Sequence, residues 1–449
     1  MASRGSLIQM VLGTPLPNNR QAVSASTHPH SPRLPLWTRE YGTLCLISFL
    51  FFASYHLLTP VLPLYLTSHH LDDRTVGLIV AGMMISSLLF RPWAGKWADE
   101  QHPRKLLWLG VSLFMAGPLL YPITHLPWVW LLVRLMQGIG FALFYTVSTS
   151  HLTHSIPPGR KTEGISYYSN AVKLAMAFSP GLGLLLAKQQ MFDWAFSLAV
   201  VLAVLAMVAI GLLRATCHHP HEEDALTAAT GAEGVEAPKF AGKPTGKPTG
   251  RLFYAKALRP GWVMYTNSIV FGALIPFVPL LARHQGLLNA DVWFYSVYAV
   301  FLMLSRALTG RWADRHGYAV VVVPGMALVT LSLWLLASVA QPILFLAAAA
   351  LYGLGAGVVQ PSLIAWAADL APKSDRGAAM ATFTMCTDLG IASGSYLMAV
   401  AGGAWGYPAT LWLLSLLPLA GLLTFGLFHG KLNPFSLKQA GMTTPAFDS

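Results

Sequence analysis

The chain has 449 residues, of which 55% are hydrophobic and only 10% are charged. A soluble domain carries roughly 25% charged residues, so the composition excludes a water-soluble protein of this length. The net charge of +11 would suggest nucleic-acid binding in a soluble protein, but most positive charges here lie in alternate loops between apolar segments. We therefore expect a membrane protein surrounded by lipid, with no nucleic-acid partner.

Apolar blocks of about 20 residues recur along the chain, and this length crosses a hydrocarbon core of roughly 30 Å. They predict an all-α membrane protein with twelve transmembrane helices. The first six blocks are 41–66, 73–93, 104–124, 128–150, 164–187 and 193–213. The last six blocks are 261–283, 290–309, 318–340, 343–366, 377–401 and 408–429.

Polar segments separate the chain into predicted domains. Residues 1–38 form a polar tail without a signal-peptide pattern, and residues 431–449 form a second tail. Residues 215–258 contain the repeat GKPTGKPTG and predict a flexible linker between two six-helix bundles, 39–214 and 259–430. Cys217 and the nearby His218, His219 and His221 could bind a transition metal, but a solvated linker is the favoured interpretation. We expect no cofactor and no metal site.

The basic residues of the short loops predict the orientation of the chain in the membrane. Nine of them fall in one set of alternate loops and three in the other. The larger set is Lys96, Arg104, Lys105, Arg160, Lys161, Arg311, Arg315, Lys373 and Arg376, and the smaller set is Arg74, Lys188 and Arg283. We therefore expect a multi-pass protein of the cytoplasmic (inner) membrane with the larger set and both termini in the cytoplasm.

The two halves of the sequence repeat one another. The segment RPWAGKWAD, which starts at Arg91, recurs 215 residues later as RALTGRWAD, starting at Arg306. The same shift relates residues 138–140 to 353–355 and Pro157 to Pro372. Repeated halves of six helices are a known transporter design, with a substrate site between them near the membrane midplane.

Several of these segments resemble motifs of the major facilitator superfamily. Residues 95–105, GKWADEQHPRK, resemble the loop signature G-x-L-A-D-x-x-G-R-K, although His102 stands where Gly is usual, and residues 310–317, GRWADRHG, resemble a second copy. Residues 134–140, RLMQGIG, resemble the R-x-x-Q-G-x-G element. The resemblance covers about residues 40–430 and implies the fold of two pseudo-symmetric six-helix bundles.

A finer resemblance is to bacterial efflux-type members of the arabinose and drug exporter branch, which includes siderophore and metallophore exporters. Residues 62–66, 91–92, 163–165 and 388–390 carry it. Residues 179–183, SPGLG, resemble the antiporter-associated G-P-x-x-G motif with Ser in place of the first Gly, so Pro180, Gly181 and Gly183 become candidate residues.

The loop signature also implies a conformational latch, in which a carboxylate faces a helix N-terminus and nearby cations. The candidate latch residues are Gly95, Asp99, Arg104 and Lys105 in the first copy, and Gly310, Asp314 and Arg315 in the second. Topology-setting loop charge is the alternative interpretation. The two glycines are expected to allow close helix approach.

Ionisable side chains inside a bilayer cost roughly 2.5–3.5 kcal/mol on insertion scales, so each is a functional candidate. Lys173 and Asp388 are separated by the repeat shift of 215 residues and therefore occupy equivalent positions of opposite charge. Asp388 is a candidate proton carrier, and Lys173 could hold an anionic substrate or counter the charge of Asp388. Arg134 could bind an anion or brace the bundle. Arg91 and Arg306 are expected near cytoplasmic helix ends, with a structural role.

Three further polar side chains are candidates for the cavity wall. The imidazole of His56 can change charge near neutral pH, although a structural histidine is equally compatible with the sequence. Tyr145 lies in the polar inner part of its helix, and Asn170 lies near Lys173.

These patterns favour a monomeric secondary transporter that exports a small organic molecule, such as a drug-like compound or a siderophore, with protons as the coupling ion. The alternative is proton-coupled uptake of a nutrient or an organic anion, for which Lys173 and Arg134 are suited. A receptor-like protein that transports nothing is a third possibility. No nucleophile–base pair or phosphate-binding loop is evident, so we do not expect an enzyme.

Overall fold

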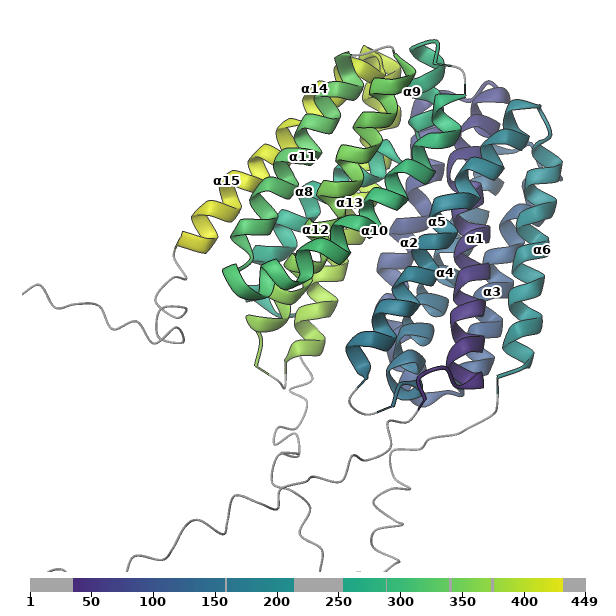
Figure 1. Ribbon diagram of the computed structural model, residues 1–449. Coiled ribbons are helices and arrows are strands. Elements are labelled where there is room, and N and C mark those ends of the chain that lie inside the picture. Colours follow the sequence, from purple (N-terminus) through teal and green to yellow (C-terminus); the bar gives the residue numbers. More distant parts are fainter. Residues whose placement is uncertain are drawn as a thin grey trace, which may run out of the picture.

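The computed structural model describes residues 35–157, 160–213, 253–287, 289–338, 341–372 and 375–430. Within these ranges it leaves undescribed the side chains of residues 99, 153, 154, 161, 162, 307–316, 376 and 428–430. All regular elements of the described ranges are helices (Figure 1). The predicted linker and both tails lie almost entirely outside the described residues.

The first group of helices comprises α1 (Arg39–Ser68), α2 (Asp73–Glu100), α3 (Pro103–Leu120), α4 (Pro127–Ser155), α5 (Lys161–Lys188) and α6 (Phe192–Gly211). Short polar caps set two of the starts. The Thr38 hydroxyl accepts a hydrogen bond from the first turn of α1, and the Asp72 carboxylate does so for α2. Helices α3 and α4 both begin at a proline, whose fixed φ suits the first helical position.

The second group comprises the short 3-10 helix η1 (Ala255–Ala257), α8 (Leu258–Leu274), α9 (Val278–His284), α10 (Ala290–His316), α11 (Ala319–Ser338), α12 (Pro342–Asp369), α13 (Arg376–Trp405), α14 (Tyr407–Leu414) and α15 (Leu416–Gly430). The predicted block 261–283 is not one straight helix, because α8 and α9 are bent by 57° relative to each other at a break that contains Pro276. The proline lacks an N–H and its ring crowds the preceding turn, which is a common cause of such a kink.

Eight described helical segments are long and apolar enough to cross a membrane, and the bent pair α8–α9 adds a ninth if it counts as one span. The chain is therefore a multi-pass membrane protein. The predicted number of twelve spans is not reached by this criterion within the described residues and stays a prediction, as does the division into two six-helix bundles.

Figure 1 shows α1 to α6 on one side of the molecule and α8 to α15 on the other. The two groups meet along two seams, α2 against α13 and α5 against α10. A glycine allows close approach in the first seam, since a Cβ on Gly77 would lie only 2.6 Å from Cβ of Ala399. In the second seam the Ser296 hydroxyl donates to the carbonyl of Ala177 at 2.8 Å.

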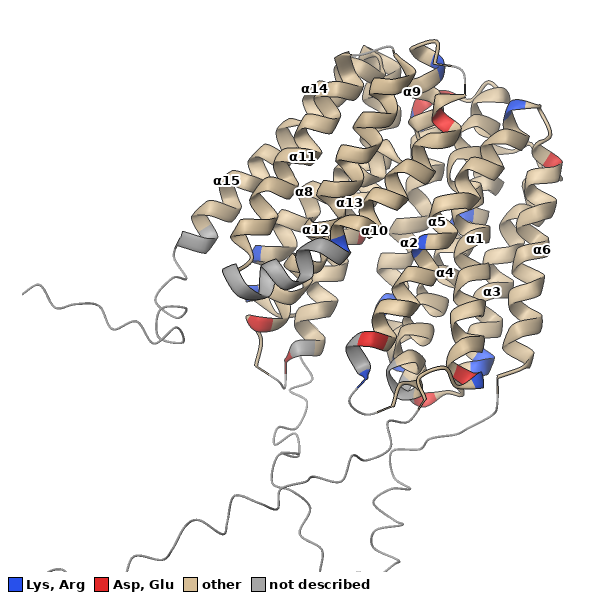
Figure 2. Ribbon diagram, viewed as in Figure 1, with Lys and Arg blue, Asp and Glu red and all other residues tan. Residues whose placement is uncertain are grey.

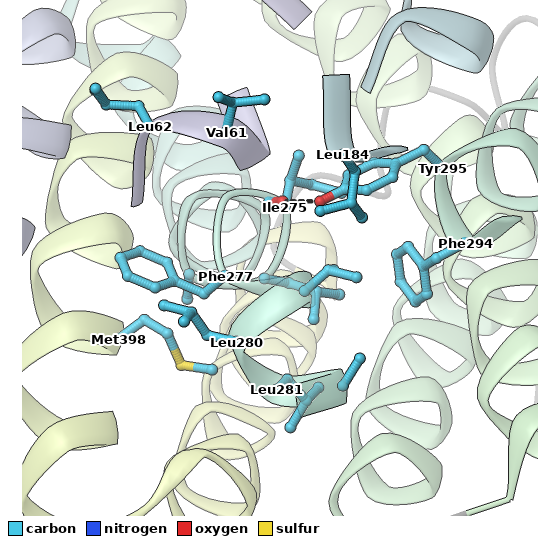
Figure 3. Packing of buried hydrophobic residues seen from close by; sticks show 14 of the residues in the cluster. Val61, Leu62, Leu184, Ile275, Phe277, Leu280, Leu281, Phe294, Tyr295 and Met398 are labelled. Carbon is cyan, nitrogen blue, oxygen red and sulfur yellow. Dashed lines mark hydrogen bonds between the residues drawn. The ribbon is translucent and has the colours of Figure 1, made fainter. Parts of the chain in front are cut away.

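Charged residues concentrate near the helix ends, and only a few lie between them (Figure 2). We call the end that carries Lys96, Arg104, Lys105 and Arg160 the basic end, and the other the far end. Towards the far end, an apolar cluster joins both helix groups. Figure 3 shows Val61 and Leu184 of the first group beside Phe277 and Tyr295 of the second, and the Tyr295 hydroxyl donates to the carbonyl of Ile275 at 2.9 Å. This packing closes the far end between the groups.

Candidate functional site

A small cavity lies between the two helix groups. It is lined by Tyr55, His56 and Thr59 of α1, Val80, Met83 and Met84 of α2, Arg134 of α4, Phe271 and Gly272 of α8, Ile275 and Pro276 at the bend, and Ile391 and Ser395 of α13. Its cavity volume is about 30 Å³, and one water molecule needs roughly 10–15 Å³ of such volume, so the cavity has room for only a few water molecules. An organic substrate can occupy this position only if the helix groups move apart.

Arg134 is the charged residue of the cavity wall, and the residue is 6% exposed. Its Nη1 donates to Oε1 of Gln137 at 3.2 Å and approaches the sulfur of Met83 at 3.2 Å. The Nε atom is buried and has no hydrogen-bond partner among the described residues. Gln137 is held independently, because its Oε1 also accepts from the Tyr121 hydroxyl at 2.5 Å and its Nε2 donates to the carbonyl of Phe114 at 3.1 Å.

Asp388 does not pair with Lys173. Its Oδ2 accepts a hydrogen bond from Nε of Arg91 at 2.6 Å, and this ion pair connects α13 to α2. The Asp388 side chain is 5% exposed, and that of Arg91 is 16% exposed. The Arg91 guanidinium also lies 5.2 Å from the ring centre of Tyr145, in cation–π range. Arg91, expected near a cytoplasmic helix end with a structural role, thus connects the two helix groups.

Arg306, the repeat-related partner of Arg91, bridges the second seam. Its guanidinium donates to the carbonyl of Gly357 at 3.3 Å, to the Ser169 hydroxyl at 3.2 Å and to Oε1 of Gln360 at 3.2 Å. Lys173 is partly buried one turn beyond Ser169 and lies within electrostatic range of Arg306. The first seam therefore holds a cation against a carboxylate, whereas the second brings two cations together.

The other predicted cavity residues are placed differently from one another. His56 is 7% exposed and lines the cavity beside Tyr55, within electrostatic range of Lys173. Tyr145 lies outside the cavity wall, under Arg91. Asn170 is exposed on the same stripe of α5 as Leu174, away from the cavity lining.

The predicted latch is described only in part. The side chains of Asp99, Asp314 and Arg315, together with Gly310, lie outside the described residues. Arg104 and Lys105 line a surface hollow with His102 and Trp108 at the start of α3. A Cβ on Gly95 would meet no atom within 4 Å, so the close helix approach expected there is wrong for this conformation.

The Pro-Gly motif of α5 lies where this helix passes between two others. A Cβ on Gly183 would collide with the carbonyl of Leu57 on α1, and one on Gly181 would lie 3.0 Å from the carbonyl of Val292 on α10. Pro180 is inside the helix. Gly183 thus allows α5 to pack closely against α1 of its own group, and Gly181 allows it to pack closely against α10 of the other group.

An ion pair at the far end was not anticipated from the sequence. Nζ of Lys188, in the last turn of α5, donates to Oδ1 of Asp291, in the first turn of α10, at 2.5 Å. The Asp291 side chain is 4% exposed, and that of Lys188 is 27% exposed. Sequence analysis used Lys188 only as a loop charge that sets the orientation and did not select Asp291. Only their opposite signs at neighbouring helix ends could have suggested the pair.

A family model described as Major Facilitator Superfamily matches residues 44–292 and 266–444. The chain belongs to this superfamily. It is therefore a membrane transporter and not an enzyme, as the sequence predicted.

Curated relatives of similar length agree with this family. The staphylopine export protein of Staphylococcus aureus (strain Mu50) is 25% identical over 375 residues, which cover 81% of this chain and 90% of that protein. The multi-drug resistance efflux pump PmrA homolog of Lactococcus lactis is 25% identical over 385 residues, covering 84% of this chain and 91% of that protein. The relatives compared here are thus efflux-type members of the superfamily, as the sequence motifs indicated.

Solved structures match the fold. The nucleoside transporter NupG has a TM-score of 0.67 at 12% identity and covers 87% of this chain and 99% of its own. The human organic anion transporter MFSD10 (TETRAN) has a TM-score of 0.61 at 18% identity and covers 86% of this chain and 99% of its own. At these identities the likeness concerns the fold alone.

Proposed function

We propose that this superfamily member exports a small organic molecule across the cytoplasmic membrane in exchange for protons, by alternating access. The observation that carries the proposal is the buried ion pair between Arg91 and Asp388, which joins the two helix groups by a bond that a single proton can break. The export direction is supported by the relatives, whose printed names are those of an export protein and an efflux pump.

The proposed architecture has twelve transmembrane helices. In it, α8–α9 form one bent span, α14–α15 form one continuous span, and residues 39–214 and 259–430 form the two bundles. The basic end and both termini face the cytoplasm, because short cytoplasmic loops are enriched in Lys and Arg. Segments 1–38, 215–258 and 431–449 are cytoplasmic, and the transporter acts as a monomer.

Coupling follows from the protonation of Asp388. When this carboxylate is ionised, it holds Arg91 and keeps α2 close to α13 at that level of the membrane. When it takes up a proton, the charge that held Arg91 is lost and the seam can open. A proton that enters from outside and leaves to the cytoplasm therefore drives one cycle in which substrate moves outward.

Two further elements control the movement. The far-end pair Lys188–Asp291 closes the α5–α10 seam, and it must break when the transporter opens outward. The loop motifs around Asp99 and Asp314 act as the latch of the basic end. Gly181 and Gly183 allow α5 to pack closely against α10 and α1, and α5 moves relative to α10 during transport.

The proposed substrate is a drug-like compound or a siderophore or other metal chelator, in line with the names of the two relatives. The test compares the spent medium and cytoplasm of bacteria with and without the gene by untargeted mass spectrometry. Export predicts at least one compound that is depleted in the medium and enriched in the cells when the gene is deleted. The reverse distribution would indicate uptake, and an unchanged distribution would contradict transport of any compound made by these cells.

A further inference from the structure

Lys173 of α5 lies between two contacts that join this helix to α10. One turn before it, the Ser169 hydroxyl accepts a hydrogen bond from Nη1 of Arg306 at 3.2 Å. One turn after it, the carbonyl of Ala177 accepts a hydrogen bond from the Ser296 hydroxyl at 2.8 Å. Side chains four residues apart lie on one face of a helix, so Lys173 faces the second seam between these two contacts. It is partly buried there.

The two cations of this part of the seam, Lys173 and Arg306, have no anionic partner among the described residues. Lys173 has no hydrogen bond or ion pair there, and its electrostatic neighbours are Arg306 and the imidazole of His56. Arg306 donates to a carbonyl, a hydroxyl and an amide oxygen at 3.2–3.3 Å. A guanidinium binds a carboxylate at about 2.7–2.9 Å, so these neutral acceptors orient the guanidinium without cancelling its charge. Two like charges therefore repel each other in a seam of low dielectric constant.

The described carboxylates of the helices around this site are engaged elsewhere. On α5, Glu163 pairs with Arg160 at the basic end. On α10, Asp291 pairs with Lys188 at the far end. Asp388 is held in the first seam. The described residues thus supply no anion to the second seam, and a ligand can supply it.

The repeat indicates which kind of anion fits. The 215-residue shift relates Arg91 to Arg306 and Lys173 to Asp388. In the first seam, the carboxylate at the second of these positions accepts a hydrogen bond from the arginine at 2.6 Å. In the second seam, the same position carries an ammonium group. A carboxylate between Lys173 and Arg306 would give the second seam the neutralised arginine that the first seam has.

We infer that Lys173 and Arg306 form a binding site for a carboxylate of the substrate, so that the transported molecule is an organic anion held across the second seam. The inference rests on the proposed export function and names the substrate class. The bound carboxylate joins α5 to α10, as Asp388 joins α13 to α2. His56 lines the cavity within electrostatic range of Lys173, so the body of the molecule extends from this site towards the largely apolar cavity wall.

The test measures binding to the purified full-length chain in detergent through thermal unfolding followed by tryptophan fluorescence. The probes are the sodium salts of acetate, benzoate, succinate and citrate, each beside its neutral methyl ester and beside sodium chloride of equal ionic strength. Lys173→Gln and Arg306→Gln each remove one cation, and Lys173→Asp places a carboxylate opposite Arg306. The control Arg283→Gln removes an exposed cation at the far end.

At about ten times its Kd, at least one carboxylate is expected to raise Tm of wild type and of Arg283→Gln by about 2 °C, while its ester and sodium chloride do not. Lys173→Gln and Arg306→Gln each lose most of this shift. Lys173→Asp has a higher Tm than wild type without any probe, because a repulsive pair has become an attractive one. It shows no shift with the probe, because the protein itself now supplies the carboxylate.

The inference is overturned if no carboxylate stabilises wild type, if the ester or chloride stabilises it equally, or if Lys173→Gln and Arg306→Gln keep the full shift. These two variants decide the question on their own if Lys173→Asp yields no folded protein. The mass-spectrometric comparison separates this inference from the proposed function. An exported compound that is neutral or cationic overturns the anion assignment and leaves export intact, whereas an unchanged distribution of compounds contradicts export and leaves the carboxylate site intact.

Discussion

Replacing Asp388 by Asn tests the link between the two helix groups. The substitution removes the carboxylate that lies 2.6 Å from Arg91 and leaves this largely buried cation with the Tyr145 ring as its remaining described contact. Removing one partner of a buried ion pair destabilises a protein by about 3–5 kcal/mol. At about 2.1 cal/mol/K per residue, the roughly 350 described residues have an unfolding entropy of about 0.7 kcal/mol/K, so this loss lowers Tm by about 4–7 °C.

The measurement is thermal unfolding of the purified variants in detergent at neutral pH. Asp388→Asn is compared with Arg91→Met and with the double variant, which removes both charges. The double variant is expected to recover most of the stability lost in either single variant, because neither charge is then left unpaired. If Asp388→Asn unfolds at the wild-type temperature, or if the losses in the double variant simply add, the pair does not hold the α2–α13 seam.

Three other outcomes follow from the structure. Lys188→Gln breaks the far-end pair, so the α5–α10 seam should open more often. In a protein whose native cysteines are replaced, a Ser296→Cys probe in this seam should then react faster with a membrane-impermeant maleimide added to whole cells. Unchanged labelling would contradict a closing role for the Lys188–Asp291 pair. Gly183→Leu should abolish folded protein in fluorescence-detected size exclusion, whereas Gly95→Leu should not. A side chain at position 183 would collide with the backbone carbonyl of Leu57, but one at position 95 meets no atom within 4 Å. Hydrogen bonds from the first turn of α2 hold the pKa of Asp72 below its ordinary value, so the stability it contributes is complete at neutral pH and is lost as the pH falls below the usual aspartate range. The Tm difference between wild type and Asp72→Ala should shrink accordingly, and a pH-independent difference would contradict the cap.

The helices were largely predictable because apolar blocks of membrane-spanning length leave little choice of secondary structure. The predicted block 41–66 corresponds to α1 at Arg39–Ser68, and 193–213 corresponds to α6 at Phe192–Gly211. The bend at Pro276 and the break at Ser415 were not predicted, because prolines and polar residues are also found inside unbroken membrane helices. Pro180, for example, lies within α5 without ending it.

The contacts of the site were less predictable than its members. Sequence reasoning selected Arg134, His56 and Asp388 because buried ionisable groups are costly in a membrane. It could not pair Asp388 with Arg91, since these residues are 297 positions apart and their contact depends on how α2 and α13 pack. The repeat suggested Lys173 as the natural counter-charge, but residues related by the repeat lie in different seams and do not face each other.

The central claim, proton-driven export, is tested most directly in everted membrane vesicles with the compound identified by mass spectrometry. An acidic lumen should drive accumulation of this compound inside wild-type vesicles, a protonophore should abolish it, and Asp388→Asn vesicles normalised for folded protein should only reach equilibrium. Accumulation that survives the protonophore, or that persists in Asp388→Asn, would contradict proton coupling through this carboxylate.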